Sequence, residues 1–210
     1  MHRLLHILAT ACSFVLHPLL MPTYGMGMFL AAMHINNRPI SLAFELITIT
    51  GTIILTLLIP GSIIIYLWKT KRIDSLHIDN SNQRTAPYIY TIMAYGFWTI
   101  FLYDVLQLPL AVVMVSIGGI LALGIVTIVN HWWKISAHLT GLGGLIGGLC
   151  GYALFTFHIP LILVLVLLLL ALVLMYARLY LNAHTPLQVV CGLLLGLLAT
   201  FIPNLILAYA

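Results

Sequence analysis

Charged side chains are scarce in this sequence. Only 6% of its 210 residues are charged, 63% are hydrophobic, and the mean hydropathy is +1.17. Soluble domains carry charge on about a quarter of their residues, so this composition excludes an ordinary soluble protein. A membrane-spanning helix needs about 20 apolar residues, and the polar breaks between the apolar runs leave six or seven such helices. We therefore expect an all-α, polytopic membrane helix bundle in which residues 1–210 form a single domain.

Acidic residues are fewest of all. Lys and Arg number eight against four Asp and Glu, which gives a net charge of +4. The basic residues sit in short loops and form no run of the kind that binds nucleic acid. We expect anionic membrane lipids as partners and no nucleic acid. Cys12, Cys150 and Cys191 all lie in apolar segments, where cysteine behaves as a small buried side chain.

The apolar runs also predict where the helices lie. His17-Pro18 breaks the first run, which is compatible with one kinked span or with a short interfacial helix followed by a span from about 17 to 33, and we favour the second. Pro60-Gly61 predicts a bend in the second span. The long polar segment 69–86 has to lie outside the lipid, because its backbone groups need water or protein partners. The remaining spans are expected at 41–68, 87–106, 110–130, 137–156 and 160–177, with a last one starting near 186.

Glycines recur every four residues in two of these helices. The helix expected at 137–156 carries Gly143, Gly147 and Gly151, and the last helix of the chain carries Gly192 and Gly196. Small residues at this spacing let two helix backbones approach closely in a membrane. We therefore expect the two helices to touch, which would bring their starting ends together.

Both of those ends follow a polar segment, 131–138 in one case and 178–188 in the other. Ser136 is a good helix cap and precedes His138, while Thr185 follows His184 and is a second good cap. The free N–H groups and the positive dipole at a helix start favour a bound anion such as phosphate.

Basic side chains accompany these histidines. Arg84 and Arg178 can donate forked hydrogen bonds to phosphate oxygens, and Lys134 is a third candidate cation. The same pattern also has purely structural interpretations. Thr185-x-x-Gln188 is a capping box, Ser136 is a helix cap, and Lys134 is an interface anchor.

Three motifs together resemble the type 2 phosphatidic acid phosphatase superfamily, whose motifs run K-x6-R-P, P-S-G-H and S-R-x5-H-x3-D. The corresponding stretches here are His77-x6-Arg84-Thr85, Ile135-Ser136-Ala137-His138 and Ala177-Arg178-x5-His184-x3-Gln188. The resemblance spans residues 77–188, and the last two motifs are the most specific.

The resemblance implies a role for each matching residue. His184 would attack phosphorus as the nucleophile, and His138 would protonate the leaving alcohol and then activate water. The phosphoryl oxygens would be held by Arg84, Arg178 and Ser136, with Lys134 and His77 near them. The scheme implies no cofactor and no metal.

Gln188 is the main departure from the family pattern. The family has an aspartate there, which orients the nucleophilic histidine and stabilises its charged form. A glutamine oxygen can accept the imidazole N–H but supplies no charge, and loss of such a charge costs roughly 10⁴ in rate in the serine-protease case. Asp74 and Asp79 lie on the correct side of the membrane to replace it if their loop folds inward.

The expected function is that of an integral-membrane phosphatase acting on a lipid phosphomonoester or diphosphate. The alternative is a catalytically weak or inactive protein that binds or transports phospholipids on the same scaffold, and a third hypothesis is a haem-binding bundle that uses histidine pairs. Most basic residues lie on the motif side, which by the positive-inside rule indicates the cytoplasm. Bacterial relatives of the family usually present the site to the periplasm, and we expect a bacterial inner-membrane protein of that orientation.

Overall fold

The structure, a computed structural model, describes residues 2–36, 40–76, 78, 81–156 and 161–210. Over these residues it contains helices and no strand, which confirms the predicted all-α class. The elements are α1 (His2–Val15), η1 (Pro18–Leu20), α2 (Met21–Ile35), α3 (Leu42–Ile53), η2 (Ile54–Leu58), α4 (Ile59–Lys69), η3 (Ser81–Arg84), α5 (Thr85–Asp104), α6 (Leu110–Val129), α7 (Ala137–Thr156), α8 (Leu161–Tyr180) and α9 (Pro186–Tyr209).

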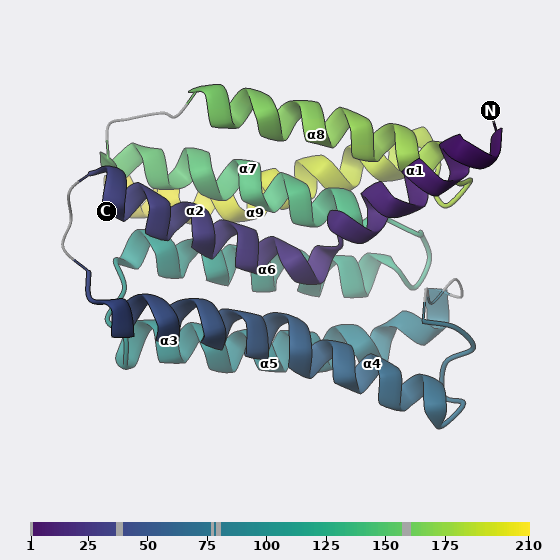
Figure 1. Ribbon diagram of the computed structural model, residues 1–210, viewed down its shortest axis with the longest axis horizontal. Coiled ribbons are helices and arrows are strands. Elements are labelled where there is room, and N and C mark those ends of the chain that lie inside the picture. The colour runs from purple at the N-terminus through teal and green to yellow at the C-terminus, as the bar shows by residue number, and fades with distance from the viewer. Residues whose placement is uncertain (1, 37–39, 77, 79–80, 157–160) are drawn as a thin grey trace.

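The helices lie side by side along one common direction (Figure 1). Within the described residues, six segments are long and apolar enough to cross a membrane. They are His2–Ile35, Leu42–Lys69, Leu110–Val129, Ala137–Thr156, Leu161–Tyr180 and Pro186–Tyr209. The tyrosine-rich α5 is less apolar than these six but runs along the same bundle (Figure 1). The chain is a multi-pass membrane protein.

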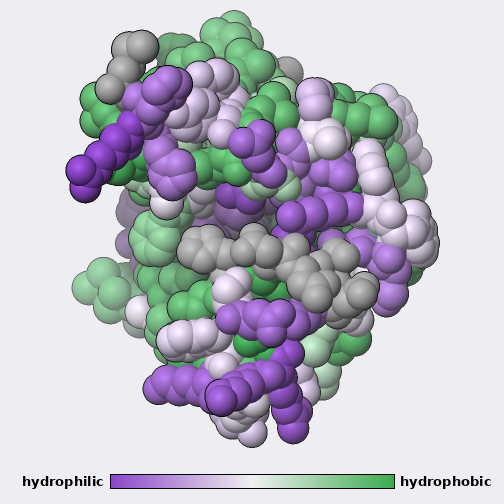
Figure 2. Space-filling model, turned by 90° about the vertical axis from the view of Figure 1, so that its right-hand side faces the viewer, coloured by the Kyte–Doolittle hydropathy of each residue, from purple (hydrophilic) through white to green (hydrophobic). Residues whose placement is uncertain are grey.

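The polar segments that carry the described motif residues lie at one end of the bundle. The starts of α5, α7 and α9 all lie at this end, on the right of Figure 1. Figure 2 views the same end and shows hydrophilic side chains gathered on it. Arg84, at the start of α5, and the segments 131–138 and 178–188 therefore lie at one face of the molecule, as the sequence predicted.

The glycines of α7 and α9 lie in a direct contact between the two backbones. A Cβ added to Gly192 would lie 2.6 Å from the carbonyl oxygen of Ser136, and one added to Gly143 would overlap the backbone of Leu193. A side chain at either position would therefore push the helices apart. This confirms the predicted α7–α9 contact, which holds the starts of both helices next to each other.

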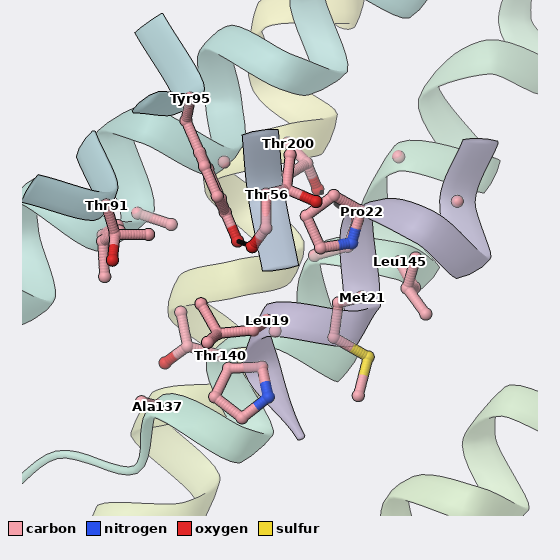
Figure 3. Close-up of a pocket in the computed structure, with 18 of the residues that line it drawn as sticks. Leu19, Met21, Pro22, Thr56, Thr91, Tyr95, Ala137, Thr140, Leu145 and Thr200 are labelled. Carbon is pink, nitrogen blue, oxygen red and sulfur yellow. Dashed lines mark hydrogen bonds between the residues drawn. The ribbon is translucent and has the colours of Figure 1, made fainter. Parts of the chain in front are cut away.

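The second span is irregular at the predicted place, although its form is a turn of π-helix and not a simple bend. Pro60 has no N–H to donate to the carbonyl of Thr56, four residues earlier. The chain forms η2 immediately before this proline, and the Thr56 carbonyl accepts a hydrogen bond from the Tyr95 hydroxyl at 3.4 Å (Figure 3). A single π turn inside an α-helix is frequently found at a functional site.

The N-terminal segment breaks at His17-Pro18, as predicted. α1 ends at Val15, and the 3-10 turn η1 leads into α2. α1 lies along α8 in the bundle (Figure 1), and Leu16 shares a buried apolar cluster with Ala171 and Leu174 of α8. The junction between α1 and α2 thereby lies close to the end of the bundle that carries the motifs.

Candidate functional site

The loop between α8 and α9 fixes the place of His184. The Thr185 hydroxyl accepts a hydrogen bond from the Gln188 N–H at 3.5 Å, and Pro186 occupies the first position of α9. In return, Oε1 of Gln188 accepts from the Thr185 N–H at 3.0 Å, which completes a capping box. The amide oxygen of Gln188 is therefore engaged by the backbone, as the structural interpretation of this motif predicted.

A backbone carbonyl orients the His184 imidazole. Nδ1 of His184 lies 3.0 Å from the carbonyl oxygen of Lys134. A carbonyl can only accept, so Nδ1 carries the hydrogen and the lone pair of the neutral ring is on Nε2. Close by, the Ser136 N–H donates to the Gln188 carbonyl at 3.3 Å. The backbones of segments 131–138 and 178–188 are thus joined beside the imidazole.

The surroundings of His184 favour its neutral form. Burial and the nearby Arg178 guanidinium lower the pKa of His184 from its ordinary 6.5 to about 4, against the opposite effect of the hydrogen bond to the Lys134 carbonyl. At neutral pH the ring is therefore uncharged. An uncharged imidazole with a lone pair on Nε2 is the form that can attack an electrophile.

His138 lies in the first turn of α7. The buried Ser136 caps this helix, since its Oγ accepts from the Leu139 N–H at 3.5 Å. The imidazole of His138 is half-buried and shares a hydrogen bond with the backbone of Ser13, at the end of α1. Each of the two motif histidines thus has a backbone partner from a segment distant in the chain.

Two guanidinium groups lie near these imidazoles. Arg84 is only 8% exposed, its Nε donates to the Ile78 carbonyl at 2.7 Å, and its side chain hydrogen-bonds to the Tyr88 hydroxyl. Arg178, in the last turn of α8, donates from Nη1 to the Ser13 hydroxyl at 3.2 Å. Both guanidiniums are held by the protein, which reduces the reorganisation needed when they bind an oxyanion.

These groups share one cavity of about 330 Å³. Its wall includes His138, His184, Arg84 and Arg178 at the motif end. The wall also includes Leu102, near the far end of α5. A helix rises about 1.5 Å per residue, so the 18 residues from Arg84 to Leu102 span about 27 Å, close to the thickness of the hydrocarbon core. Figure 3 shows side chains from several helices around this cavity, with the Tyr95–Thr56 hydrogen bond among them. A cationic end therefore continues into a long, mainly apolar interior.

The remaining predicted site residues lie differently. Among the described residues that line the cavity, Lys134, Ser136 and Gln188 do not appear: Lys134 acts on His184 through its carbonyl, and the other two cap helices. His77 lies outside the described residues. The phosphate-binding and catalytic roles of all these residues stay predictions.

The acids that the structure describes do not reach His184. Asp74 accepts from Nε2 of Gln83 at 2.8 Å and is exposed. Glu45 pairs with His34, 2.6 Å away, at the other end of the bundle. Asp79 lies outside the described residues. In the described part of the chain, no group of three or more His, Cys, Asp or Glu side chains is placed to hold a metal ion.

Sequence reasoning missed the contribution of the N-terminal segment. It treated His17 as part of the break at His17-Pro18, but the imidazole lines the cavity, with its centroid 5.4 Å from that of His138. It gave Ser13 no role, although this residue contacts both His138 and Arg178. The histidine at the proline break was the available signal, since a break in a membrane helix is tolerated where it lines a cavity.

Comparison with known proteins gives one match. Residues 131–209 match the model of the PAP2 superfamily, over a stretch that contains α7, α8, α9 and both motif histidines. Arg84 and the N-terminal helices lie outside the matched stretch. No curated protein and no solved structure matches the chain.

Proposed function

Because the chain belongs to the PAP2 superfamily through residues 131–209, we propose that it is a membrane phosphatase that hydrolyses a lipid phosphomonoester or diphosphate through a phosphohistidine. The observation that carries the proposal is the single cavity that contains two imidazoles and two guanidiniums. Two cations within reach of a neutral imidazole suit a tetrahedral oxyanion whose phosphorus lies beside Nε2 of His184.

The reaction proceeds in two displacements. In the first, the Nε2 lone pair of His184 forms a bond to phosphorus, and the bond from phosphorus to the lipid oxygen breaks. His138, as the imidazolium, gives a proton to that oxygen and becomes the neutral base of the second step, so the lipid leaves as a neutral alcohol, or as the shorter phosphate if the substrate is a diphosphate. In the second, water forms a bond to phosphorus, passes a proton to His138, and the phosphorus–nitrogen bond breaks to release phosphate.

The chain's own groups supply the electrostatics of both steps. Arg84 and Arg178 hold the equatorial oxygens as negative charge spreads over them. The Lys134 carbonyl keeps Nδ1–H of His184 fixed, so that Nε2 faces the phosphorus. The partial positive charge that the ring gains in the phosphohistidine is shared with this carbonyl, in the position where the family uses a carboxylate.

The shape of the cavity supports a lipid substrate. Beyond the cations, its wall is formed by apolar side chains of α2, α5 and α6, among them Phe29, Trp98 and Val112. An acyl or prenyl chain can lie there while its phosphate stays at the motif end. We propose that the substrate comes from the bilayer of a bacterial inner membrane, with the site at the periplasmic face, as bacterial relatives of the family usually present it.

The experiment measures phosphate released by detergent-purified protein from phosphatidic acid and from a polyprenyl diphosphate. We expect release from at least one of them and its loss in His184→Ala. His131→Ala is the matched control, because His131 is exposed and its Nδ1 contacts the Thr127 carbonyl of its own helix. Mass spectrometry of a His138→Ala sample incubated with p-nitrophenyl phosphate and quenched in base should find the phosphoryl group on His184, because p-nitrophenolate leaves without a proton whereas the second step still needs the base. Turnover that survives His184→Ala would reject the phosphohistidine mechanism, and binding without turnover would reject the enzyme in favour of a lipid-binding protein.

A further inference from the structure

The break between α1 and α2 is packed onto the first turns of α7. A Cβ added to Gly141 would lie 2.9 Å from Cγ of Met21 and 3.4 Å from Cα of Pro18, so the glycine leaves room for this junction. The 3-10 turn that contains Leu19 (Figure 3) contacts α7. The break is therefore held one turn of helix away from His138.

His17 lies at this break, with a defined orientation. Its Nδ1 accepts a hydrogen bond from the Leu19 N–H at 3.3 Å, which makes His17 the cap of η1. A neutral ring with an accepting Nδ1 carries its hydrogen on Nε2. The backbone N–H of Leu19 thus holds the Nδ1 side of the His17 imidazole, and the Nε2–H lies on the opposite side of the ring.

The His17 ring contacts the His138 ring edge to face. The centroids are 5.4 Å apart, with an angle of 81° between the planes, and both rings line the cavity that contains His184 and Arg178. Ser13, one turn before His17, hydrogen-bonds to His138 through its backbone. Two residues of the N-terminal segment therefore restrain the same imidazole, one through a nitrogen and one through the ring.

We propose that His17 is a positioning residue for His138, which it holds in the orientation that delivers a proton to the leaving oxygen. The proposal rests on the proposed phosphatase function. The general acid must point at a specific oxygen, and edge-to-face contact fixes the plane of its ring. The N-terminal segment thereby becomes part of the site, although it lies outside the stretch that matches the family.

The test uses two substrates that differ in their need for a general acid. A lipid alcohol is a poor leaving group and requires the proton, whereas p-nitrophenolate leaves without it. His17→Asn is the main variant, because asparagine is a good cap and can still accept from the Leu19 N–H. Because kcat/KM reports the formation of the phosphohistidine and not the later step in which His138 activates water, we expect kcat/KM for phosphatidic acid to fall roughly 10- to 100-fold, part of the 10²–10⁴ that a general acid contributes. For p-nitrophenyl phosphate we expect kcat/KM to fall less than about threefold.

Three further variants make the outcome decisive. His138→Asn should show the same selective loss, only larger, and the exposed His6→Asn on α1 should show none. His17→Ala, which also removes the cap, should match His17→Asn in selectivity if it folds. Equal losses on both substrates in His17→Asn would indicate a purely structural role and overturn the proposal, as would unchanged kinetics. Failure of the phosphatase function itself would be seen separately, as a wild-type protein with no His184-dependent release.

Discussion

Two adjacent glycines of α7, Gly143 and Gly144, face different surroundings and should respond in opposite ways to alanine. A Cβ at Gly143 would overlap the backbone of Leu193 in α9 and lie 2.9 Å from its carbonyl carbon. A Cβ at Gly144 would lie 3.6 Å from Cγ2 of Thr200, an ordinary van der Waals contact. The two variants carry the same added methyl group on the same helix and differ only in what that methyl meets.

The size of each effect follows from these contacts. Alanine is favoured over glycine in a helix by roughly 0.5–1 kcal/mol, so Gly144→Ala should be neutral or slightly stabilising. Gly143→Ala forces the α9 backbone to retreat by on the order of 1 Å, and overpacking of this kind costs about 1–3 kcal/mol. The same displacement separates the start of α7 from the start of α9. Since a 1 Å misplacement of reacting groups costs about 10²-fold in rate, phosphate release should fall by about that factor.

Both quantities can be measured on detergent-purified protein. Thermal unfolding followed by circular dichroism should give a lower Tm for Gly143→Ala and an equal or higher Tm for Gly144→Ala, while phosphate release gives kcat for each. A Gly143→Ala protein as stable and active as Gly144→Ala would show that the α7–α9 contact is looser than the structure has it. In that case the argument that this contact holds the two histidines together would be refuted.

Three other predictions concern the site itself. The lowered pKa of His184 means that the proposed nucleophile stays neutral down to about pH 4. After correction for the titration of the substrate's own phosphate, kcat/KM for p-nitrophenyl phosphate should therefore fall on its acidic side near pH 4 and not near 6.5. Gln188→Asp should not raise kcat, because the Lys134 carbonyl already binds Nδ1 of His184. Denaturant unfolding in detergent should show that Gln188→Asp lowers the free energy of unfolding by up to about 1 kcal/mol, because the hydrogen bond to the Thr185 N–H is lost. Arg84→Lys should lower kcat by roughly 10²-fold, since one ammonium cannot replace a forked donor, and a steady-state assay would detect it.

Local patterns in the sequence predicted much of the fold. The spans follow from runs of apolar residues, and Thr185 with Pro186 marks the start of α9 through capping preferences that depend only on neighbouring residues. The contact between α7 and α9 was predictable because glycines four residues apart in both helices leave a groove for a backbone. That contact in turn places His138 and His184 in one cavity.

The partners of the two imidazoles were not predictable in the same way. The spacing of four residues from His184 suggested Gln188 as the orienting group. The Gln188 side chain instead accepts from the Thr185 N–H at the start of α9, and the Lys134 carbonyl, 50 residues away, binds the imidazole. His17 reaches His138 only because η1 and α2 pack against α7, which no local pattern shows. Both misses concern contacts between segments distant in the chain, which depend on how the helices pack.

The carbonyl that holds His184 has a consequence for how such proteins are recognised. Every residue type has this oxygen, so no substitution at position 134 removes it, provided that the loop keeps its path. A comparison that scores only the residue types at motif positions would count Gln188 as the loss of the family's aspartate and would classify the chain as an inactive family member. The main chain can take over an orienting task without leaving any trace in the motif, and an inactive enzyme is better diagnosed from the path of the backbone around its nucleophile.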